Sequence, residues 1–316
     1  MWNFPLLPDI GSTGAYENDL VFWLETTIVV SLTFFGFALM AFLVYRYHRG
    51  RKVDRSHPPH HNYTLEYVLM AGLLGIGLIL FPIGAVVYYR LAVPPDNALE
   101  MYVVGKQWMW KVEHPGGKSE INELHVPLGQ PVKLMLTSQD VIHSFYVPAF
   151  RVKQDVLPGR YTHLWFQPSR PGRYHLFCAE YCGTNHSSMI GWVTVMEPAE
   201  YDAWLSQGGR GPSMAEQGEQ LFVQYHCAGC HRGSQTVRAP HLEGVYGKSV
   251  PLQRGNEVYF TMADERYIRD SILMPKNEVV AGYEPLMPSF QGQISESDLL
   301  KIIAYIKSIG NKEATP

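Results

Sequence analysis

Four cysteines in two close pairs are the residues of this 316-residue chain whose spacing points most directly to chemistry. The first pair lies in Cys178-Ala-Glu-Tyr-Cys182-Gly-Thr-Asn-His186-Ser-Ser-Met189, where two thiols, an imidazole and a thioether fall within twelve residues. Sulfur ligands combined with imidazole favour copper or zinc over magnesium or calcium. A second imidazole is offered upstream by His143, in Asp-Val-Ile-His-Ser.

Three other interpretations of this segment stay open. Cys178 and Cys182 could form a disulfide in an oxidising compartment. The cysteines and histidines could hold structural zinc, or His143 could be a packed core residue. A disulfide explains neither His186 nor Met189, and a thioether is a poor ligand for zinc. The donor types therefore favour copper, and the second cysteine provides the two sulfurs that a bridged pair of copper ions needs.

The second pair forms Cys227-Ala-Gly-Cys230-His231, the Cys-x-x-Cys-His pattern of covalent haem attachment. Two thioether bonds would fix the porphyrin, and His231 would bind iron from one face. The second axial ligand is expected downstream at Met287, which we favour over Met274 because an amphipathic terminal helix follows it directly. Methionine plus histidine ligation raises the reduction potential of haem.

Two long apolar runs precede these motifs and predict a membrane hairpin. Residues 20–44 contain one charge, Glu25, and residues 67–89 contain none; as helices, both can cross a hydrocarbon core of about 30 Å. The basic residues between the runs are Arg46, Arg49, Arg51, Lys52 and Arg55. The positive-inside rule places this loop in the cytoplasm and the chain after residue 90 outside, on the periplasmic side in a bacterium. A cleaved signal peptide is the alternative, but the basic cluster follows the first run instead of preceding it.

Short apolar stretches separated by glycine and proline follow the hairpin. They lie at 101–104, 131–136, 161–166 and 191–195. Such spacing predicts an all-β sandwich or barrel for residues 91–200. The glycine-rich sequence within 201–212 predicts a linker.

The last part of the chain, residues 213–316, is expected to be all-helical around the haem motif. Apolar residues at helical spacing predict helices over 214–225 and 295–309. With an exterior N-terminal segment at 1–19 and the hairpin at 20–90, the chain is expected to be a multidomain membrane protein.

These motifs together resemble subunit II of the haem-copper cytochrome c oxidases. The resemblance covers about residues 20–200 and rests on the two-span hairpin, on Trp-Met-Trp at 108–110, and on Cys-x-Glu-x-Cys-Gly-x-x-His-x-x-Met with its upstream histidine. It implies a cupredoxin-like domain with a binuclear copper centre, called CuA. The ligands implied by position are His143, Cys178, the backbone carbonyl of Glu180, Cys182, His186 and Met189. Residues 213–316 resemble a class I cytochrome c, which implies one covalent haem c on Cys227, Cys230, His231 and Met287.

The resemblance implies three further roles. The Glu180 carboxylate would face a magnesium site shared with subunit I. Trp108 matches the aromatic residue through which electrons enter the copper centre, with a sandwich-core tryptophan as the alternative. Glu66, at the start of the second span, lies where the family carries a glutamate at the mouth of a proton channel. An acid favoured by the helix dipole is the other interpretation of Glu66, since the flanking family pattern is absent.

The sequence therefore predicts the electron-input subunit of a terminal oxidase in the bacterial inner membrane. Electrons would pass from a donor, such as a bc-type complex or a soluble cytochrome c, through haem c and CuA to a proton-translocating subunit I that reduces oxygen to water. The expected partners are subunit I, other oxidase subunits and membrane lipid. A net charge of −3 gives no support for nucleic-acid binding. The alternatives are a nitric-oxide reductase subunit of the same architecture and a membrane-anchored redox or copper-handling protein.

Overall fold

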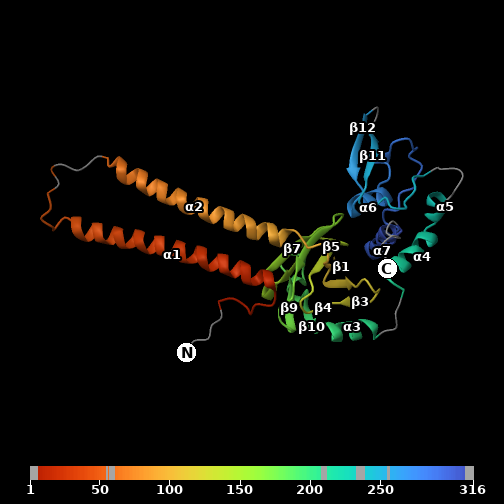
Figure 1. The fold of residues 1–316 in the computed structure, drawn as a ribbon, viewed down its shortest axis with the longest axis horizontal. Coiled ribbons are helices and arrows are strands. Elements are labelled where there is room, and N and C mark those ends of the chain that lie inside the picture. Colours follow the sequence, from red (N-terminus) through yellow and green to blue (C-terminus); the bar gives the residue numbers. More distant parts are fainter. Residues whose placement is uncertain are drawn as a thin grey trace.

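Two long helices project from a globular part that contains the strands and shorter helices (Figure 1). The computed structural model describes residues 6–54, 56, 61–207, 212–232, 239–254 and 257–309. Helix α1 spans Thr13–Tyr47 and α2 spans Tyr63–Ala92, so each contains one of the predicted apolar runs. Both begin at a side-chain cap: Ser12 accepts a hydrogen bond from the N–H of Ala15, and Asn62 accepts one from Leu65.

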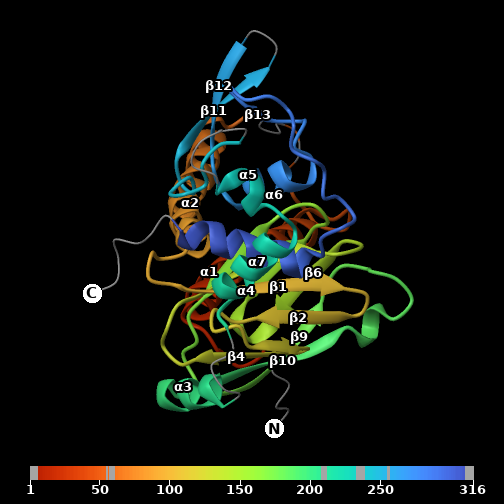
Figure 2. The same ribbon diagram turned by 90° about the vertical axis from the view of Figure 1, so that its right-hand side faces the viewer.

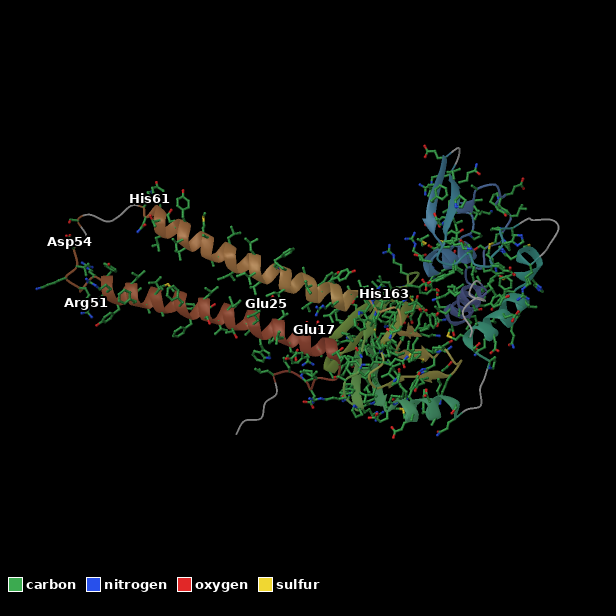
Figure 3. The ribbon with its side chains drawn as sticks, viewed as in Figure 1. Glu17, Glu25, Arg51, Asp54, His61 and His163 are labelled. Atoms are coloured by element: carbon green, nitrogen blue, oxygen red, sulfur yellow. The ribbon has the colours of Figure 1, made fainter. Side chains whose placement is uncertain are left out.

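Apart from Ala15 and Asp19 in the first turns of α1, which are buried, the residues of both helices lie partly or fully exposed. Mean hydropathy reaches 2.4 in α1 and 2.3 in α2, and 0% of either apolar window is buried in the chain. A helix that is apolar on all sides and uncovered by protein needs lipid around it. Figure 3 shows Arg51, Asp54 and His61 at the end of the hairpin remote from the globular part, and Glu17 at the other end. The loop residues Arg55, His57 and His60 lie outside the described residues.

The middle of the chain is a β-sandwich of two five-stranded sheets. One has the order β3-β2-β1-β5-β8 and the other β4-β10-β9-β6-β7. The first sheet consists of β1 (Leu99–Lys106), β2 (Met109–Glu113), β3 (Ser119–Ile121), β5 (Val132–Ser138) and β8 (Thr162–Phe166). The second consists of β4 (Glu123–Pro127), β6 (His143–Val147), β7 (Val152–Val156), β9 (Gly172–Cys178) and β10 (Ile190–Met196). The four apolar stretches of the sequence coincide with β1, β5, β8 and β10.

Alternating side chains build the core between the sheets. Met101 and Val103 on β1 are fully buried, as are Trp110 on β2 and Phe145 on β6. Because period-two alternation directs these residues to one face of each strand, the strand ends that carry the polar motifs are held by a rigid apolar core. Two 3-10 turns, η1 (Pro148–Phe150) and η2 (His186–Ser188), complete the sandwich.

Helix α3 (Pro198–Ser206) includes residue 201, the predicted first residue of the linker. Tyr201 is buried in the sandwich core, and Trp204 and Leu205 pack against it. The spacing of these three residues places them on one face of a helix, which explains why the packed part extends beyond the predicted boundary. Of the predicted linker, residues 208–211 lie outside the described residues.

The C-terminal part, residues 212–309, forms a domain of its own. Its helices are α4 (Met214–Gln224), α5 (Ala228–His231), α6 (Glu265–Leu273) and α7 (Glu296–Ser308). The helices predicted at 214–225 and 295–309 are thus confirmed as α4 and α7. Gly218 lets them cross closely, because an added Cβ there would lie 1.9 Å from the carbonyl oxygen of Lys301.

A small sheet accompanies these helices, which the all-helical expectation did not include. Its order is β12-β11-β13, with β11 (Ser249–Arg254), β12 (Glu257–Met262) and β13 (Val279–Val280). Val250 and Leu252 are buried on one face of β11, while Val258 and Phe260 lie exposed on β12. This period-two alternation is the sequence signal for the hairpin. Figure 2 shows α4 and α7 lying across the first sheet of the sandwich.

Candidate copper centre and haem cavity

Neighbouring strands bring the upstream histidine to the cysteine loop. His143 begins β6 and Cys178 ends β9, and these two strands pair so that Phe145 lies opposite Cys178. Cys182 follows in the loop after β9. His186 begins the turn η2, and Met189 directly precedes β10. Residues 46 positions apart in sequence, from His143 to Met189, therefore meet at one edge of the sandwich.

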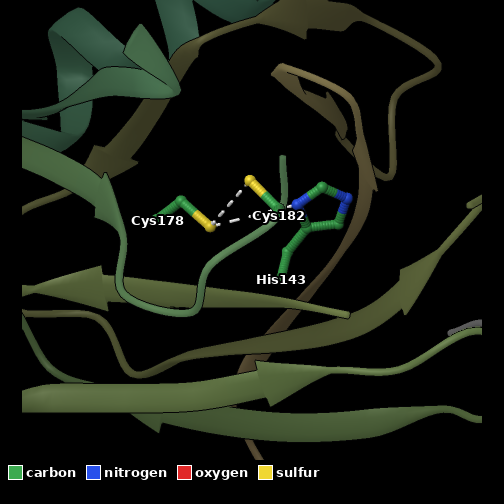
Figure 4. Close-up of side chains that lie close together, drawn as sticks. All are labelled: His143, Cys178 and Cys182. Atoms are coloured by element: carbon green, nitrogen blue, oxygen red, sulfur yellow. Dashed lines mark hydrogen bonds between the residues drawn. The ribbon is translucent and has the colours of Figure 1, made fainter. Parts of the chain in front are cut away.

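The donor atoms of these residues form one cluster, and Figure 4 shows three of its members, His143, Cys178 and Cys182. The two sulfurs lie 3.8 Å apart, and both thiols are free, so the structure contains no disulfide between them. His143 Nδ1 is 3.9 Å from Cys178 Sγ, and His186 Nδ1 is 3.4 Å from Cys182 Sγ. The remaining donors are also close: Met189 Sδ lies 3.8 Å from Cys182 Sγ, and the carbonyl oxygen of Glu180 lies 3.2 Å from Cys178 Sγ. This set of soft sulfur and imidazole donors fits copper.

Asp140 orients the imidazole of His143. Its Oδ1 lies 2.8 Å from His143 Nε2, so the proton resides on Nε2 and the lone pair of Nδ1 faces the sulfurs. The carboxylate is itself held by backbone N–H groups of Gln107 and Val141, each at 2.7 Å. His143 is fully buried, which makes this arrangement rigid.

Proton affinity differs between the two thiols. Burial raises the pKa of Cys178, but hydrogen bonds with His143 and with the backbone of Ser144 and Glu180 lower it to about 6. The pKa of Cys182 is raised to about 12 by burial and by the neighbouring Cys178 sulfur. Without metal the pair therefore favours a single thiolate, and a cation bound to both sulfurs would release the second proton.

The β1–β2 connection lies against the cysteine loop. Gln107 Nε2 donates to the carbonyl oxygen of Cys182 at 2.8 Å. A Cβ added at Gly183 would lie 3.3 Å from Cζ2 of Trp108, so the indole contacts the loop directly. Trp108 is half-buried and also packs against the sandwich core, as the alternative interpretation expected.

A second site is a cavity of about 510 Å³ in the C-terminal domain. Cys227, Cys230, His231 and Met287 all line it, whereas Met274 is not among the described residues of its wall. Apolar side chains make up much of the rest, including Phe222, Ile268, Ile272, Ile302 and Ile306. His231 Nδ1 donates to the carbonyl oxygen of Pro240 at 2.9 Å, which leaves Nε2 as the lone pair for iron. An apolar cavity with these four groups in its wall fits covalently attached haem.

The structure keeps Glu66 apart from both sites. It lies exposed in the first turn of α2, with His61 Nδ1 at 3.9 Å from its Oε1. Glu180 is an exposed residue within the loop that carries Cys178 and Cys182, called the copper loop. Sequence reasoning missed Gln107 and Pro240, since a backbone or amide partner leaves no pattern of its own.

Comparison with known proteins gives two matching families. Cytochrome c oxidase subunit II, periplasmic domain, matches residues 117–196, and cytochrome c matches residues 215–310. The C-terminal domain, residues 212–309, is therefore a cytochrome domain. An alternative cytochrome c oxidase subunit 2 from Bradyrhizobium diazoefficiens is 33% identical over 233 residues, which cover 63% of this chain and 82% of the relative. The chain belongs to the cytochrome c oxidase subunit II family.

Other relatives of this subunit II carry the same name. Cytochrome c oxidase subunit 2 of Cereibacter sphaeroides is 30% identical over 256 residues, covering 65% of this chain and 82% of the relative. Cytochrome c oxidase subunit 2 of Alkalihalophilus pseudofirmus is 32% identical over 225 residues, which cover 68% of this chain and 62% of the relative. The crystal structure of the periplasmic domain of subunit II from Bradyrhizobium japonicum is 31% identical, covers 36% of this chain and 96% of that one, and has a TM-score of 0.35.

Family membership confirms several predictions made from the sequence. This oxidase subunit II is part of an oxidoreductase and a membrane protein with two spans. Its two families imply copper and haem c, and its family implies association with subunit I and other oxidase subunits. The predicted fold class is confirmed as a whole, with the small sheet added to the helical domain.

Proposed function

We propose that this subunit II receives electrons from a donor through a covalent haem c, collects them in a binuclear CuA centre and passes them to subunit I, where oxygen is reduced to water. The observation that carries the proposal is the pair of sulfurs 3.8 Å apart with an imidazole Nδ1 beside each. A mononuclear site would use one cysteine. A second buried thiol with its own histidine is what a second copper ion requires.

The imidazole donors divide evenly between two copper ions. His143 lies beside Cys178 and His186 beside Cys182, so each copper ion would have an imidazole of its own while the two share both sulfurs. The Met189 thioether and the Glu180 carbonyl oxygen are the remaining weak donors. When bound, such a centre supplies one-electron transfer with little change in geometry. The buried core around His143 and Met189 would keep the ligands fixed in both redox states.

The cytochrome domain would hold haem through its own side chains. Cys227 and Cys230 would form the thioether bonds, while His231 and Met287 would bind iron from opposite faces. Pro240 fixes the ring of His231 through its Nδ1 hydrogen bond. The apolar wall would keep water from the haem, and together with methionine ligation this would raise the reduction potential of the haem.

Three peripheral roles and the orientation belong to the same proposal. Trp108 contacts the copper loop and remains partly exposed, which suits an aromatic residue through which electrons reach the centre. The exposed Glu180 would contribute its carboxylate to magnesium at the contact with subunit I. Glu66, exposed at the start of α2, would stand at a proton-channel entrance. The basic loop between the spans would face the cytoplasm of a bacterium, and both redox domains would face the periplasm.

The relatives favour oxygen over nitric oxide as the terminal acceptor. Those reported above are named cytochrome c oxidase subunits. A copper-handling role requires an ion that exchanges readily, whereas His143 and Met189 are fully buried. The donor, a bc-type complex or a soluble cytochrome c, would dock on the exterior part of the chain.

The experiment is a determination of copper, zinc and covalent haem in the purified full-length chain. We expect two copper ions and one haem per chain. Cys182→Ser should lose copper and keep haem, whereas Cys230→Ser should weaken haem attachment and keep copper. One copper per chain, or zinc in its place, would overturn the binuclear proposal.

A further inference from the structure

Strand β1 is buried on both faces, although it belongs to a two-sheet sandwich, in which a strand ordinarily has one face open to solvent. Met101 and Val103 point into the sandwich core. Tyr102 and Val104 alternate with them and are also buried, because they form a separate cluster with Met135, Met214 of α4 and Leu300 of α7. The cytochrome domain therefore covers the face of β1 that a two-layer sandwich leaves to solvent.

Charged groups hold this contact together. Lys307 on α7 reaches Glu100 on β1, with Nζ 2.7 Å from Oε1, and Glu265 on α6, with Nζ 2.9 Å from Oε1. Glu100 also accepts a hydrogen bond from the hydroxyl of Tyr102 at 2.8 Å. Burial raises the pKa of Glu100, but the charges of Lys307 and Lys133 and the hydrogen bonds from Lys307 and Tyr102 together outweigh burial. The pKa is therefore lowered, and the carboxylate stays ionised at this contact.

Two more polar contacts cross the same boundary. Lys111 Nζ on β2 donates to Ser297 Oγ on α7 at 2.7 Å, and Ser297 also bonds to Glu113. Arg269 on α6 donates to the carbonyl oxygen of Gly159 at 3.3 Å. The contact thus combines an apolar centre with charged and polar groups at several points around it, as stable interfaces do.

Helix α7 is the layer between the haem cavity and β1. Ile302 and Ile306 line the cavity. Leu300 packs on β1, Ala304 packs beside it, and Lys307 bonds to β1, which places residues 300, 304 and 307 on the opposite side of the helix.

On its inner face, β1 touches a copper ligand. A Cβ added at Gly105 would lie 3.0 Å from Cδ2 of His143 and 3.2 Å from Cζ3 of Trp110. The glycine therefore allows the imidazole of His143 to lie directly against the β1 backbone. A continuous series of packed atoms runs from the haem cavity through α7 and β1 to this ligand.

We propose that the cytochrome domain delivers electrons from this docked position, that Lys307 holds it there, and that β1 is the shared wall across which the electron reaches His143. The inference rests on the proposed function and adds its geometry: the domain need not leave the sandwich between turnovers. One electron lost at the haem is gained at the copper pair, and no proton or atom is transferred in the step. Lys307 is a positioning residue in this scheme.

The first test compares Lys307→Met with Lys301→Met in the full-length holoprotein. Lys301 lies on the same helix, and its ion pair is with Asp298, inside the cytochrome domain. Loss of this half-buried interdomain charge should slow electron transfer from photoreduced haem to copper by roughly tenfold. Added salt should restore part of that rate, because it screens the carboxylates of Glu100 and Glu265, which lose their shared counter-charge. The Lys301 control should keep the parent rate. Equal rates for both variants at every salt concentration would contradict the role of Lys307.

The second test locks the contact and does not depend on Lys307. In the proposed holoprotein all four native cysteines are occupied, so Lys111→Cys combined with Ser297→Cys supplies two reactive thiols whose parent side chains touch. A short bismaleimide should cross-link them in high yield, and Lys307→Met should lower that yield, which is a readout independent of turnover. The cross-linked protein should keep the haem-to-copper rate. A locked protein that no longer transfers electrons would overturn the docked-position proposal.

Spectra recorded before either test distinguish a failure of the proposed function from a failure of the docked position. Absence of the copper or haem spectrum would count against the proposed function itself. Both spectra present, with transfer lost on cross-linking, would count against the docked position alone.

Discussion

Arg151 and Asp19 form a bidentate ion pair that joins the first long helix, α1, to the β-sandwich. Arg151 Nε lies 2.9 Å from Oδ1 of Asp19, and Nη2 lies 2.8 Å from Oδ2. Both side chains are largely buried. Close by, the hydroxyl of Ser12, the cap of α1, donates to the carbonyl oxygen of Phe150 at 3.0 Å. The start of the membrane hairpin is thus fixed to the domain that carries the proposed copper ligands.

Asp19→Asn should destabilise the chain, because it leaves the guanidinium of Arg151 partly buried without its counter-charge. We expect a loss of roughly 3 kcal/mol in unfolding free energy, measured by thermal unfolding in detergent. Glu123→Gln is the matched control, since it removes the exposed pair with Arg173 and should cost less than about 1 kcal/mol. Equal losses for the two variants would show that the buried pair carries no special weight.

Asp140→Asn should weaken copper binding while leaving haem attachment unchanged. The carboxylate sets which nitrogen of His143 carries the proton, and partners of this kind typically account for about ten- to a hundredfold in metal affinity. Competition with a chelator of known copper affinity measures the change. Asp96→Asn, on an exposed residue before β1, serves as the control and should keep the parent affinity. An unchanged affinity in Asp140→Asn would remove Asp140 from the account.

Met287→Ala should retain covalent haem and lower its reduction potential, since the thioether ligand that favours the ferrous state is lost. Met274→Ala is the matched control, because Met274 lies outside the described wall of the cavity. A redox titration and the haem absorption spectrum report both effects. The reverse outcome, with the potential changed only in Met274→Ala, would assign the axial ligand to the other methionine.

Stability should fall in acid because of Glu120. Burial raises the pKa of its carboxyl, but hydrogen bonds from His114 and His125 lower it from 4.5 to about 2. A pKa that is lower in the folded state stabilises the fold above pH 4.5, and this stabilisation, about 3 kcal/mol, is lost as the pH falls toward 2.

Glu120→Gln should therefore be less stable than the parent at pH 7 and lose less stability between pH 4.5 and 2. Glu200→Gln, an exposed neighbour on α3, should follow the parent curve. Unfolding followed at several pH values gives both slopes. Parallel curves for the parent and Glu120→Gln would show that another group governs the acid transition.

The sequence carries the chemistry of this protein more completely than its architecture. The cysteine motifs are local, so ligand types and spacing alone bring the four cysteines, His186, Met189 and His231 to attention. His143 and Met287 lie outside these motifs, and the choice of Met287 depends on the terminal helix that follows it. The uninterrupted apolar runs likewise predict α1 and α2, since membrane spans need only length and hydropathy. Boundaries are harder to predict: Tyr201 looks like part of a linker until the sandwich core that buries it is known.

Contacts between distant segments leave no pattern in one sequence. Nothing in Glu100 or Lys307 alone indicates that they meet across 207 residues, or that β1 is covered on both faces. The hydrogen bond from Gln107 to the carbonyl oxygen of Cys182 is likewise not predictable from the sequence, because it depends on where the β1–β2 turn lies relative to the copper loop. Such relationships come from the folded topology and had to be observed.

The electron paramagnetic resonance spectrum of the copper-loaded full-length chain tests the central claim most directly. If Cys178 and Cys182 hold two copper ions as proposed, the two ions would share one unpaired electron, so we expect a mixed-valence signal whose hyperfine splitting comes from two equivalent nuclei. A signal from one isolated cupric ion would contradict the account.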